Sequence, residues 1–324
     1  MNRKLVFFVV GLVVLSLTGC NLPRATPTPY PTPILLSSPT PLLTTPTIAE
    51  PTATVPTATV SLPTVTPAAA TPTTGGAVSG SPSGPYAVIL VAPSDVLTIR
   101  SAAGAGSAAV GSFAATATNV MRTGPTSTVG KALWVQVENP SGGNGWVNAA
   151  FLTEYVAPAS FCADTRINTL LTNFGNALDD SNGGSLAALV SPAHGMAIHL
   201  WRNGNVVTFY PKDALWVFGS TYVHHWGAAP GSGLDTNGAF HVVVLPKLLD
   251  VFNAGYSLTC NSLGTATQYG SNPWPLEYAN VNYYTVYKPG TSGDDLDWRY
   301  WLVGVEYIQG QPYVFGLIHF QWEP

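Results

Sequence analysis

The sequence predicts a chain of several parts: a disordered linker, a small all-β barrel and a C-terminal α+β domain with a curved antiparallel sheet. Three observations support this division. Residues 21–84 hold 14 Pro and 16 Thr but only two charged side chains. Residues 86–156 consist of short apolar runs broken by Gly, Ser, Asn and Pro, which is typical of small β barrels. Residues 162–324 begin with helical periodicity and end in long alternating strands, the order expected of an α+β domain.

The composition limits the classes of partner. Charged residues are 9 % of the 324, and 12 basic side chains stand against 16 acidic ones. A nucleic-acid-binding protein normally carries a basic excess, so we expect no nucleic-acid partner.

Residues 1–20 have the pattern of a signal peptide. Arg3 and Lys4 precede thirteen uncharged residues, 5–17, a stretch too short to span a bilayer comfortably. The segment ends in Leu-Thr-Gly-Cys at 17–20, which resembles the lipobox of bacterial lipoproteins. The resemblance implies cleavage before Cys20, acylation of its thiol with chains such as palmitate, and anchoring to membrane lipid on the extracytoplasmic face. The alternatives are an ordinary cleaved signal or an uncleaved anchor.

The linker at 21–84 is too rich in proline for a helix or a central strand and too poor in apolar residues for a core. It contains a direct repeat of Pro-Thr-Ala-Thr-Val at 51–60. We expect a semi-rigid stalk that lifts the rest of the chain from the membrane, with Thr-Pro repeats as candidate O-glycosylation sites.

Two cysteines remain after Cys20. In an exported protein Cys162 and Cys260 predict one disulfide, because an even number of cysteines in an oxidising compartment is normally paired. A catalytic thiol is the alternative, but neither local sequence contains a nucleophile motif.

Residues 86–156 contain alternating strands at 96–101 and 133–137 and a Gly-Trp-Val at 145–147. Their order resembles the bacterial SH3-like domain, although Thr98 replaces the usual Asn and two Ala residues replace the first-loop Gly-Pro. The resemblance implies attachment to peptidoglycan or another envelope polymer, with Trp134 and Trp146 as candidate ligand-stacking residues. The alternative role for both Trp side chains is core packing.

The C-terminal domain, 162–324, holds seven of the nine Trp and eleven of the fourteen Tyr. A helix capped by Asp164 or Thr165 should bury one apolar face. The other expected elements are a short helix at 185–189, strands at 196–202 and 205–210 around Asn203-Gly204, a helical turn at 212–218, a strand or helix at 241–252, a strand at 281–287, and a hairpin of 300–307 with 313–322 around Gln309-Gly310. We expect a cone of the nuclear-transport-factor-like or cystatin-like kind, with a pocket.

Short segments at 226–233, 302–305 and 315–322 are similar to an uncharacterised domain of bacterial lipoproteins. This similarity supports the architecture and implies no reaction.

No motif in the C-terminal domain predicts catalysis, and we expect no cofactor and no metal. The six His lack the spacing of a zinc helix, and Ser232, with His225 and Asp235 nearby, lacks a nucleophile elbow. The acidic run at 294–297 is expected to be a solvated turn rather than a calcium loop. The candidate binding residues of this domain are His225, Trp226 and His319.

The sequence therefore predicts a lipid-anchored extracytoplasmic binding protein that attaches to peptidoglycan or another envelope polysaccharide through residues 86–156. Its C-terminal domain would recognise a ligand. The alternatives are a cell-wall or polysaccharide hydrolase with a discontinuous site, and a non-catalytic spacer.

Overall fold

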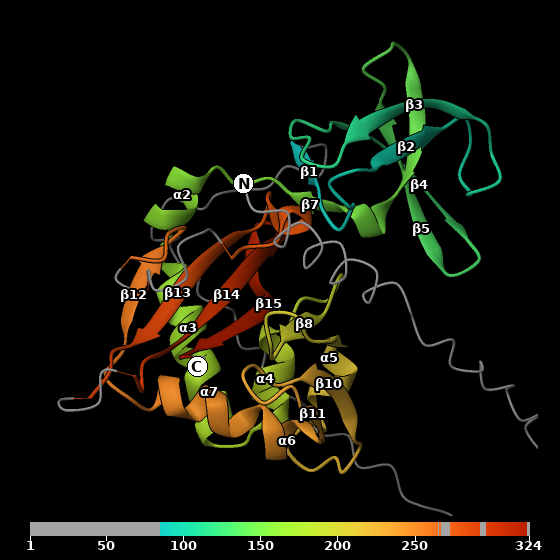
Figure 1. Cartoon of the computed structure of the whole chain (residues 1–324). Coiled ribbons are helices and arrows are strands. Elements are labelled where there is room, and N and C mark those ends of the chain that lie inside the picture. Colours follow the sequence, from blue (N-terminus) through green and yellow to red (C-terminus); the bar gives the residue numbers. More distant parts are fainter. Residues whose placement is uncertain (1–84, 265, 267–272, 292–295, 323–324) are drawn as a thin grey trace, which may run out of the picture. The chain divides into compact units, whose positions relative to one another are not determined.

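The computed structural model describes residues 85–264, 266, 273–291 and 296–322 (Figure 1). The chain divides into the units Met1–Ala69 and Ala70–Pro324, and every described residue belongs to the second unit. The predicted signal peptide, Cys20 and the Pro/Thr-rich stalk lie outside the described residues. The described part consists mainly of β-sheets, with some helices.

Residues 86–154 form seven strands in two sheets. Strands β1 (Tyr86–Val88) and β7 (Leu152–Glu154) pair with each other. The other five form an open sheet in the order β3-β2-β6-β5-β4. Their bounds are β2 Val96–Arg100, β3 Ala109–Ala114, β4 Arg122–Val129, β5 Ala132–Glu138 and β6 Asn144–Asn148.

The closed barrel predicted for this segment is not formed. Among the described strands no pairing joins the edge strands β3 and β4, so the sheet stays open. Alternating apolar residues place one face of each strand against a core, here around Ile99, Val135 and Val147. The same pattern does not specify whether the two edges meet, because closure depends on twist and stagger across the whole sheet.

The C-terminal domain contains a six-stranded sheet in the order β12-β13-β14-β15-β8-β9. Four pairings are antiparallel, but β15 and β8 run parallel. The predicted wholly antiparallel sheet is therefore wrong at this one pairing. The bounds are β8 Met196–His199, β9 Val206–Phe209, β12 Ser257–Cys260, β13 Asn282–Lys288, β14 Arg299–Ile308 and β15 Gln311–Gln321.

The final hairpin has the predicted turn. Gln309 and Gly310 both have positive φ, 52° and 72°, which is the backbone of a two-residue type I′ turn between β14 and β15. Helix α3 (Arg166–Asp179) also follows the prediction, because its buried residues recur at helical spacing and Asp164 Oδ1 accepts a hydrogen bond from the Arg166 amide.

The remaining helices are short, and the one at 158–163 was not predicted from the sequence. Residues 240–252 form two helices, with Pro246 in the first turn of the second, so the region is not a strand. The helices are α2 Pro158–Ala163, α4 Gly183–Leu189, α5 Pro211–Ala214, α6 Phe240–Val243 and α7 Leu245–Phe252.

Both faces of the six-stranded sheet are covered. Helices α3 and α7 pack on the face that carries Trp301 and Val303. The opposite face packs against Trp274, Tyr278 and Ile89, so a residue from the N-terminal part of the chain completes this second core. The Leu90 amide also donates to the Glu277 carbonyl oxygen at 2.8 Å.

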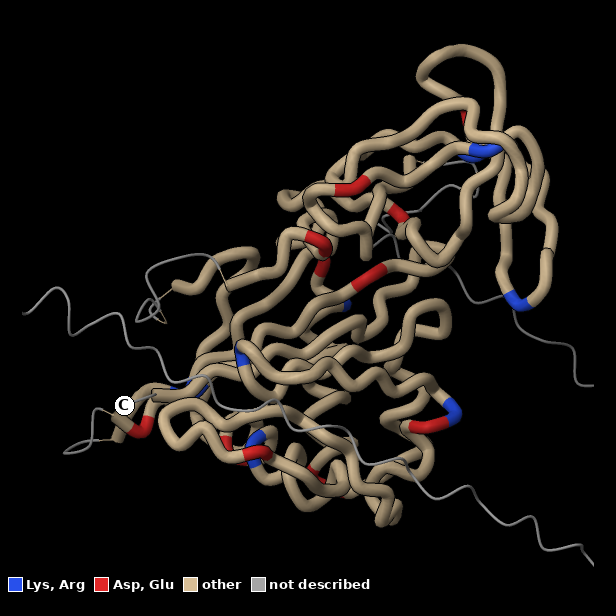
Figure 2. The backbone as a smooth tube through the Cα atoms, turned by 45° about the vertical axis from the view of Figure 1, so that its right-hand side comes forward, with Lys and Arg blue, Asp and Glu red and all other residues tan. Residues whose placement is uncertain are grey.

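The structure joins Cys162 and Cys260 by a disulfide, the pairing that the sequence predicts, with a Cα–Cα distance of 5.7 Å. The bond ties the end of α2 to β12, which is an edge strand of the six-stranded sheet. Charged residues are sparse along the described backbone, and Figure 2 shows Lys and Arg scattered along it with Asp or Glu beside several of them.

Candidate ligand-binding site

One candidate site begins where β9 ends. Pro211 starts the single turn of α5, and the Tyr210 amide donates to Asp213 Oδ2 at 3.1 Å, which holds that turn in place. Further turns follow, because the Trp216 amide donates to the Asp213 carbonyl oxygen and the Ser220 amide to that of Trp216. The chain then returns along β10 (His224–Ala228), which pairs with β11 (Asp235–Gly238).

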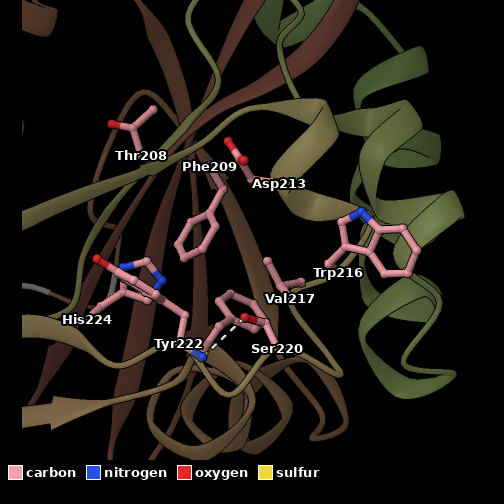
Figure 3. Close-up of a pocket in the computed structure, with 9 residues that line it drawn as sticks. Thr208, Phe209, Asp213, Trp216, Val217, Ser220, Tyr222 and His224 are labelled. Carbon is pink, nitrogen blue, oxygen red and sulfur yellow. Dashed lines mark hydrogen bonds between the residues drawn. The ribbon is translucent and has the colours of Figure 1, made fainter. Parts of the chain in front are cut away.

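These elements enclose a pocket of about 380 Å³ (Figure 3). It is lined by Thr208, Phe209, Asp213, Trp216, Val217, Ser220, Tyr222, His224 and Phe240. The lining combines apolar and aromatic side chains with a few polar groups, which is the usual composition of a small-ligand site.

The floor of the pocket is a buried aromatic cluster. The rings of Phe209 and Phe240 meet edge to face at 5.6 Å, and the His224 ring lies 5.1 Å from Phe209. Trp226 is fully buried, its ring stacked on Phe209 at 6.4 Å and its indole N–H donating to the Gly238 carbonyl oxygen. The floor is therefore rigid and built before any ligand arrives.

The rim is aromatic and exposed. Trp216 is 72 % exposed and Tyr222 is 69 % exposed, although large apolar rings are normally buried. The Tyr222 ring contacts His224 at 4.7 Å, and Figure 3 shows these two rings together on one side of Phe209 with Trp216 on the other. A flat ligand could thus contact a ring on either side.

Thr208, Ser220 and Asp213 supply hydroxyl and carboxylate groups to the lining, and His224 supplies an imidazole. Burial lowers the pKa of His224, so its neutral form is favoured. The Ser220 hydroxyl accepts a hydrogen bond from the Tyr222 amide at 3.3 Å, which stabilises a local turn between these two residues.

Two predicted residues of this region have other roles. His225 points away from the pocket, and its Nδ1 lies 2.5 Å from Asn237 Oδ1. Trp226 supports the floor from below and offers no surface to a ligand. Adjacent residues on a strand face opposite sides, so it is His224, the neighbour of the predicted His225, that lines the pocket.

His319 lies on β15 and is buried, with its ring between those of Trp201 and Trp301 at distances of 6.1 and 4.7 Å. Neither ring nitrogen makes a hydrogen bond of normal geometry with the described residues. Burial lowers its pKa well below the usual value, so the ring is held neutral. The residue packs the core and does not reach the pocket.

Trp134, predicted to stack on a ligand, is 6 % exposed but lines a second pocket of about 300 Å³. This pocket lies in the N-terminal part and includes Asp95, Val96 and Arg100. Trp146 is half-buried on β6 and is not among the lining residues.

The described residues bring no catalytic set together at the motifs that the sequence singles out. No hydrogen bond in this part of the chain joins Ser232 to His225 or Asp235. Asp294 and Asp295 lie outside the described residues, whereas Asp297 accepts hydrogen bonds from the amide and hydroxyl of Thr291. Within the described ranges no group of three His, Cys, Asp or Glu side chains could hold a metal ion.

The rim residues Trp216 and Tyr222 are absent from the sequence-based candidates. The available signal was two large aromatic residues in the short segment between β9 and β10, of which only Trp216 lies within the expected helical turn at 212–218. The sequence of so short a turn does not predict whether its aromatic side chain faces the core or the solvent.

No family model, curated protein or solved structure matches the chain. The described helices include none that is both long and apolar enough to cross a membrane.

A pH effect on stability follows from the buried histidines. His199 Nε2 lies 3.0 Å from the Tyr278 hydroxyl, and burial lowers the pKa of His199 to about 4. Between pH 6.5 and 4 the unfolded chain therefore binds a proton that the folded chain does not. We expect the free energy of unfolding to fall over this window by about 3 kcal/mol from His199 alone.

Urea unfolding of the full chain at pH 7, 6, 5 and 4 measures this effect. His199→Gln keeps a hydrogen-bonding group near Tyr278 and removes the titration, so its stability should depend less on pH. A stability that is flat between pH 6.5 and 4 in the unaltered chain would contradict the expectation.

Proposed function

We propose that this chain is a lipid-anchored extracytoplasmic protein that binds glycan of the bacterial cell envelope through the pocket between α5 and β10. The observation that carries the proposal is the pair of exposed rings, Trp216 and Tyr222, at the rim of a pocket with a buried aromatic floor. Exposing two large rings to water is unfavourable unless a ligand covers them. Sugar rings fit, because their apolar C–H faces stack on aromatic rings while their hydroxyls hydrogen-bond to groups such as Thr208 and Ser220.

The anchor and the N-terminal part complete the proposal. Cys20 at the end of the lipobox-like segment would be acylated, and the Pro/Thr-rich residues 21–84 would hold the pocket away from the membrane. Residues 86–156 would serve as a bacterial SH3-like module on the strength of their sequence motifs. The pocket that contains Trp134 supports a second attachment point to peptidoglycan or a related polymer. We also propose that the six-stranded sheet and its helices are related to cystatin-like cones.

Co-sedimentation with purified cell-wall sacculi tests the proposal on the full chain in detergent. Point variants are preferable to truncation, because Ile89 completes a core of the C-terminal domain and deletion of 86–156 would expose that core. Trp216→Ala should weaken retention about tenfold, equivalent to ~1.4 kcal/mol of binding free energy. The matched control is Trp322→Ala, because Trp322 is 40 % exposed but does not line the pocket.

Equal retention of the Trp216 and Trp322 variants would refute the pocket as the glycan site. Val96 is exposed and lines the second pocket, so Val96→Asp examines the N-terminal part separately. If only Val96→Asp lowers retention, attachment resides in residues 86–156 alone.

A hydrolase is the second candidate, because Asp213 and His224 line the same pocket and could supply an acid and a base. Prolonged incubation of sacculi with the chain, followed by measurement of new reducing ends, distinguishes the two functions. A binding protein releases none, whereas a hydrolase releases them at a rate that Asp213→Asn abolishes.

A further inference from the structure

The pocket between α5 and β10 carries charged lining residues of one sign only. Asp213 is its only acidic lining residue, and neither Lys nor Arg is among the lining residues. The lining also contains His224, whose pKa is lowered by burial, so that its neutral form is favoured. A ligand in the pocket therefore meets one net negative charge.

The carboxylate is held in place and only partly used. Asp213 Oδ2 accepts the Tyr210 amide, so the side chain cannot swing away without loss of this hydrogen bond to the start of α5. Among the described residues Oδ1 has no hydrogen-bond partner, and no cation lies within salt-bridge distance of Asp213. Asp213 Oδ1 is thus available to accept a hydrogen bond from a ligand.

The aromatic rim, like the carboxylate, favours a positively charged ligand. The face of a Trp or Tyr ring is electron-rich and attracts an ammonium group, with Trp the better of the two. Trp216 and Tyr222 present such rings at the rim, and Phe209 presents a third at the floor. Rings and carboxylate both repel an anionic ligand and both attract a cation.

We infer that the pocket selects sugars that carry a free ammonium group, such as the 2-amino-2-deoxyhexose units of a de-N-acetylated glycan. The inference rests on the proposed glycan-binding function and names the substrate class of that site. An ammonium group would donate to Asp213 Oδ1 while the sugar ring stacks on the rim. An N-acetylated sugar is neutral there and leaves the covered carboxylate without a charged partner, which is unfavourable. We expect an anionic sugar to bind more weakly, because the rings and the carboxylate both repel it.

Titration calorimetry at pH 6 with the full chain in detergent tests the inference. The probes are the tetrasaccharide of glucosamine, the tetrasaccharide of N-acetylglucosamine, and choline as a cation without a sugar ring. We expect the glucosamine tetrasaccharide to bind about tenfold more tightly than the acetylated one, and 0.3 M salt to reduce this preference. Choline should bind more weakly than either oligosaccharide.

Asp213→Asn is the decisive variant, because Asn retains an oxygen that can accept the Tyr210 amide but replaces the charged second oxygen with an uncharged NH2 group. It should lose the preference for glucosamine and keep its affinity for the acetylated tetrasaccharide. A preference that survives Asp213→Asn overturns the inference, as does equal affinity for the two oligosaccharides. Choline binding as tight as the glucosamine tetrasaccharide also overturns it, because the sugar ring would then contribute nothing.

Failure of the inference is distinguishable from failure of the proposed function. If neither tetrasaccharide binds while sacculi still retain the chain through Trp216, the ammonium preference is wrong and glycan binding stands. If retention on sacculi is also independent of Trp216, both are wrong.

Discussion

Removal of the Cys162–Cys260 disulfide is expected to lower the free energy of unfolding by about 4–5 kcal/mol. The two cysteines are 98 residues apart, so the bond closes a long loop and restricts the unfolded chain strongly. The bond also joins α2 to the edge strand β12, which has only β13 as a neighbour in the sheet. Local unfolding without the disulfide should therefore begin at the β12 edge of the sheet.

Urea unfolding of the full chain, followed by Trp fluorescence, measures the effect with and without a reducing agent. The double variant Cys162→Ser/Cys260→Ser should match the reduced protein. Cys20→Ser is the control for the remaining cysteine and should unfold at the same urea concentration as the unaltered chain. A shift below 1 kcal/mol on reduction would show that the loop is already constrained in the unfolded state.

Replacement of Glu306 by Ala is expected to lower the free energy of unfolding by about 3–5 kcal/mol. The reason is that several buried donors would lose the acceptor that they share. The Glu306 carboxylate on β14 is buried and accepts hydrogen bonds from the hydroxyls of Ser191 and Thr153. Its Oε2 also lies 2.7 Å from Nδ1 of His194. These partners come from β7 and from the segment before β8, so one side chain connects three parts of the fold.

Glu306→Gln is the matched control. It keeps the shape of the side chain and one carbonyl acceptor, and it should cost less than half as much as Glu306→Ala in the same urea experiment. The prediction fails if both variants lose equal stability, because the side-chain shape and the carbonyl acceptor that Gln retains would then contribute nothing.

The sequence patterns predicted the local elements well. The apolar spacing of α3, the Gln309-Gly310 turn and the Cys162–Cys260 pairing depend on residues close in the chain or on chemistry that leaves one choice. Residues 162–324 also show the expected order, with helices before the long final hairpin. The helix and the turn depend on short-range interactions, whereas the disulfide was predictable because only two cysteines remain after Cys20.

Long-range choices were not predictable in the same way. The parallel pairing of β15 with β8 and the open edges of the N-terminal sheet depend on which strands meet, and an alternating pattern is the same for any partner. The Glu306 cluster combines residues 153, 191, 194 and 306, whose positions in the chain share no spacing. A buried carboxylate in an otherwise apolar strand was its only sequence signal.

The candidate site shows the same difference between what the sequence predicts and what long-range packing decides. The sequence by itself determined that the C-terminal domain is rich in Trp and Tyr and carries no recognisable catalytic motif. Only the tertiary structure decided that Trp226 and His319 are buried, that His224 rather than His225 faces the pocket, and that Trp216 and Tyr222 stand exposed at its rim. The physical reason is that burial of an aromatic ring is set by neighbours from distant segments, whereas its presence is set by the sequence alone.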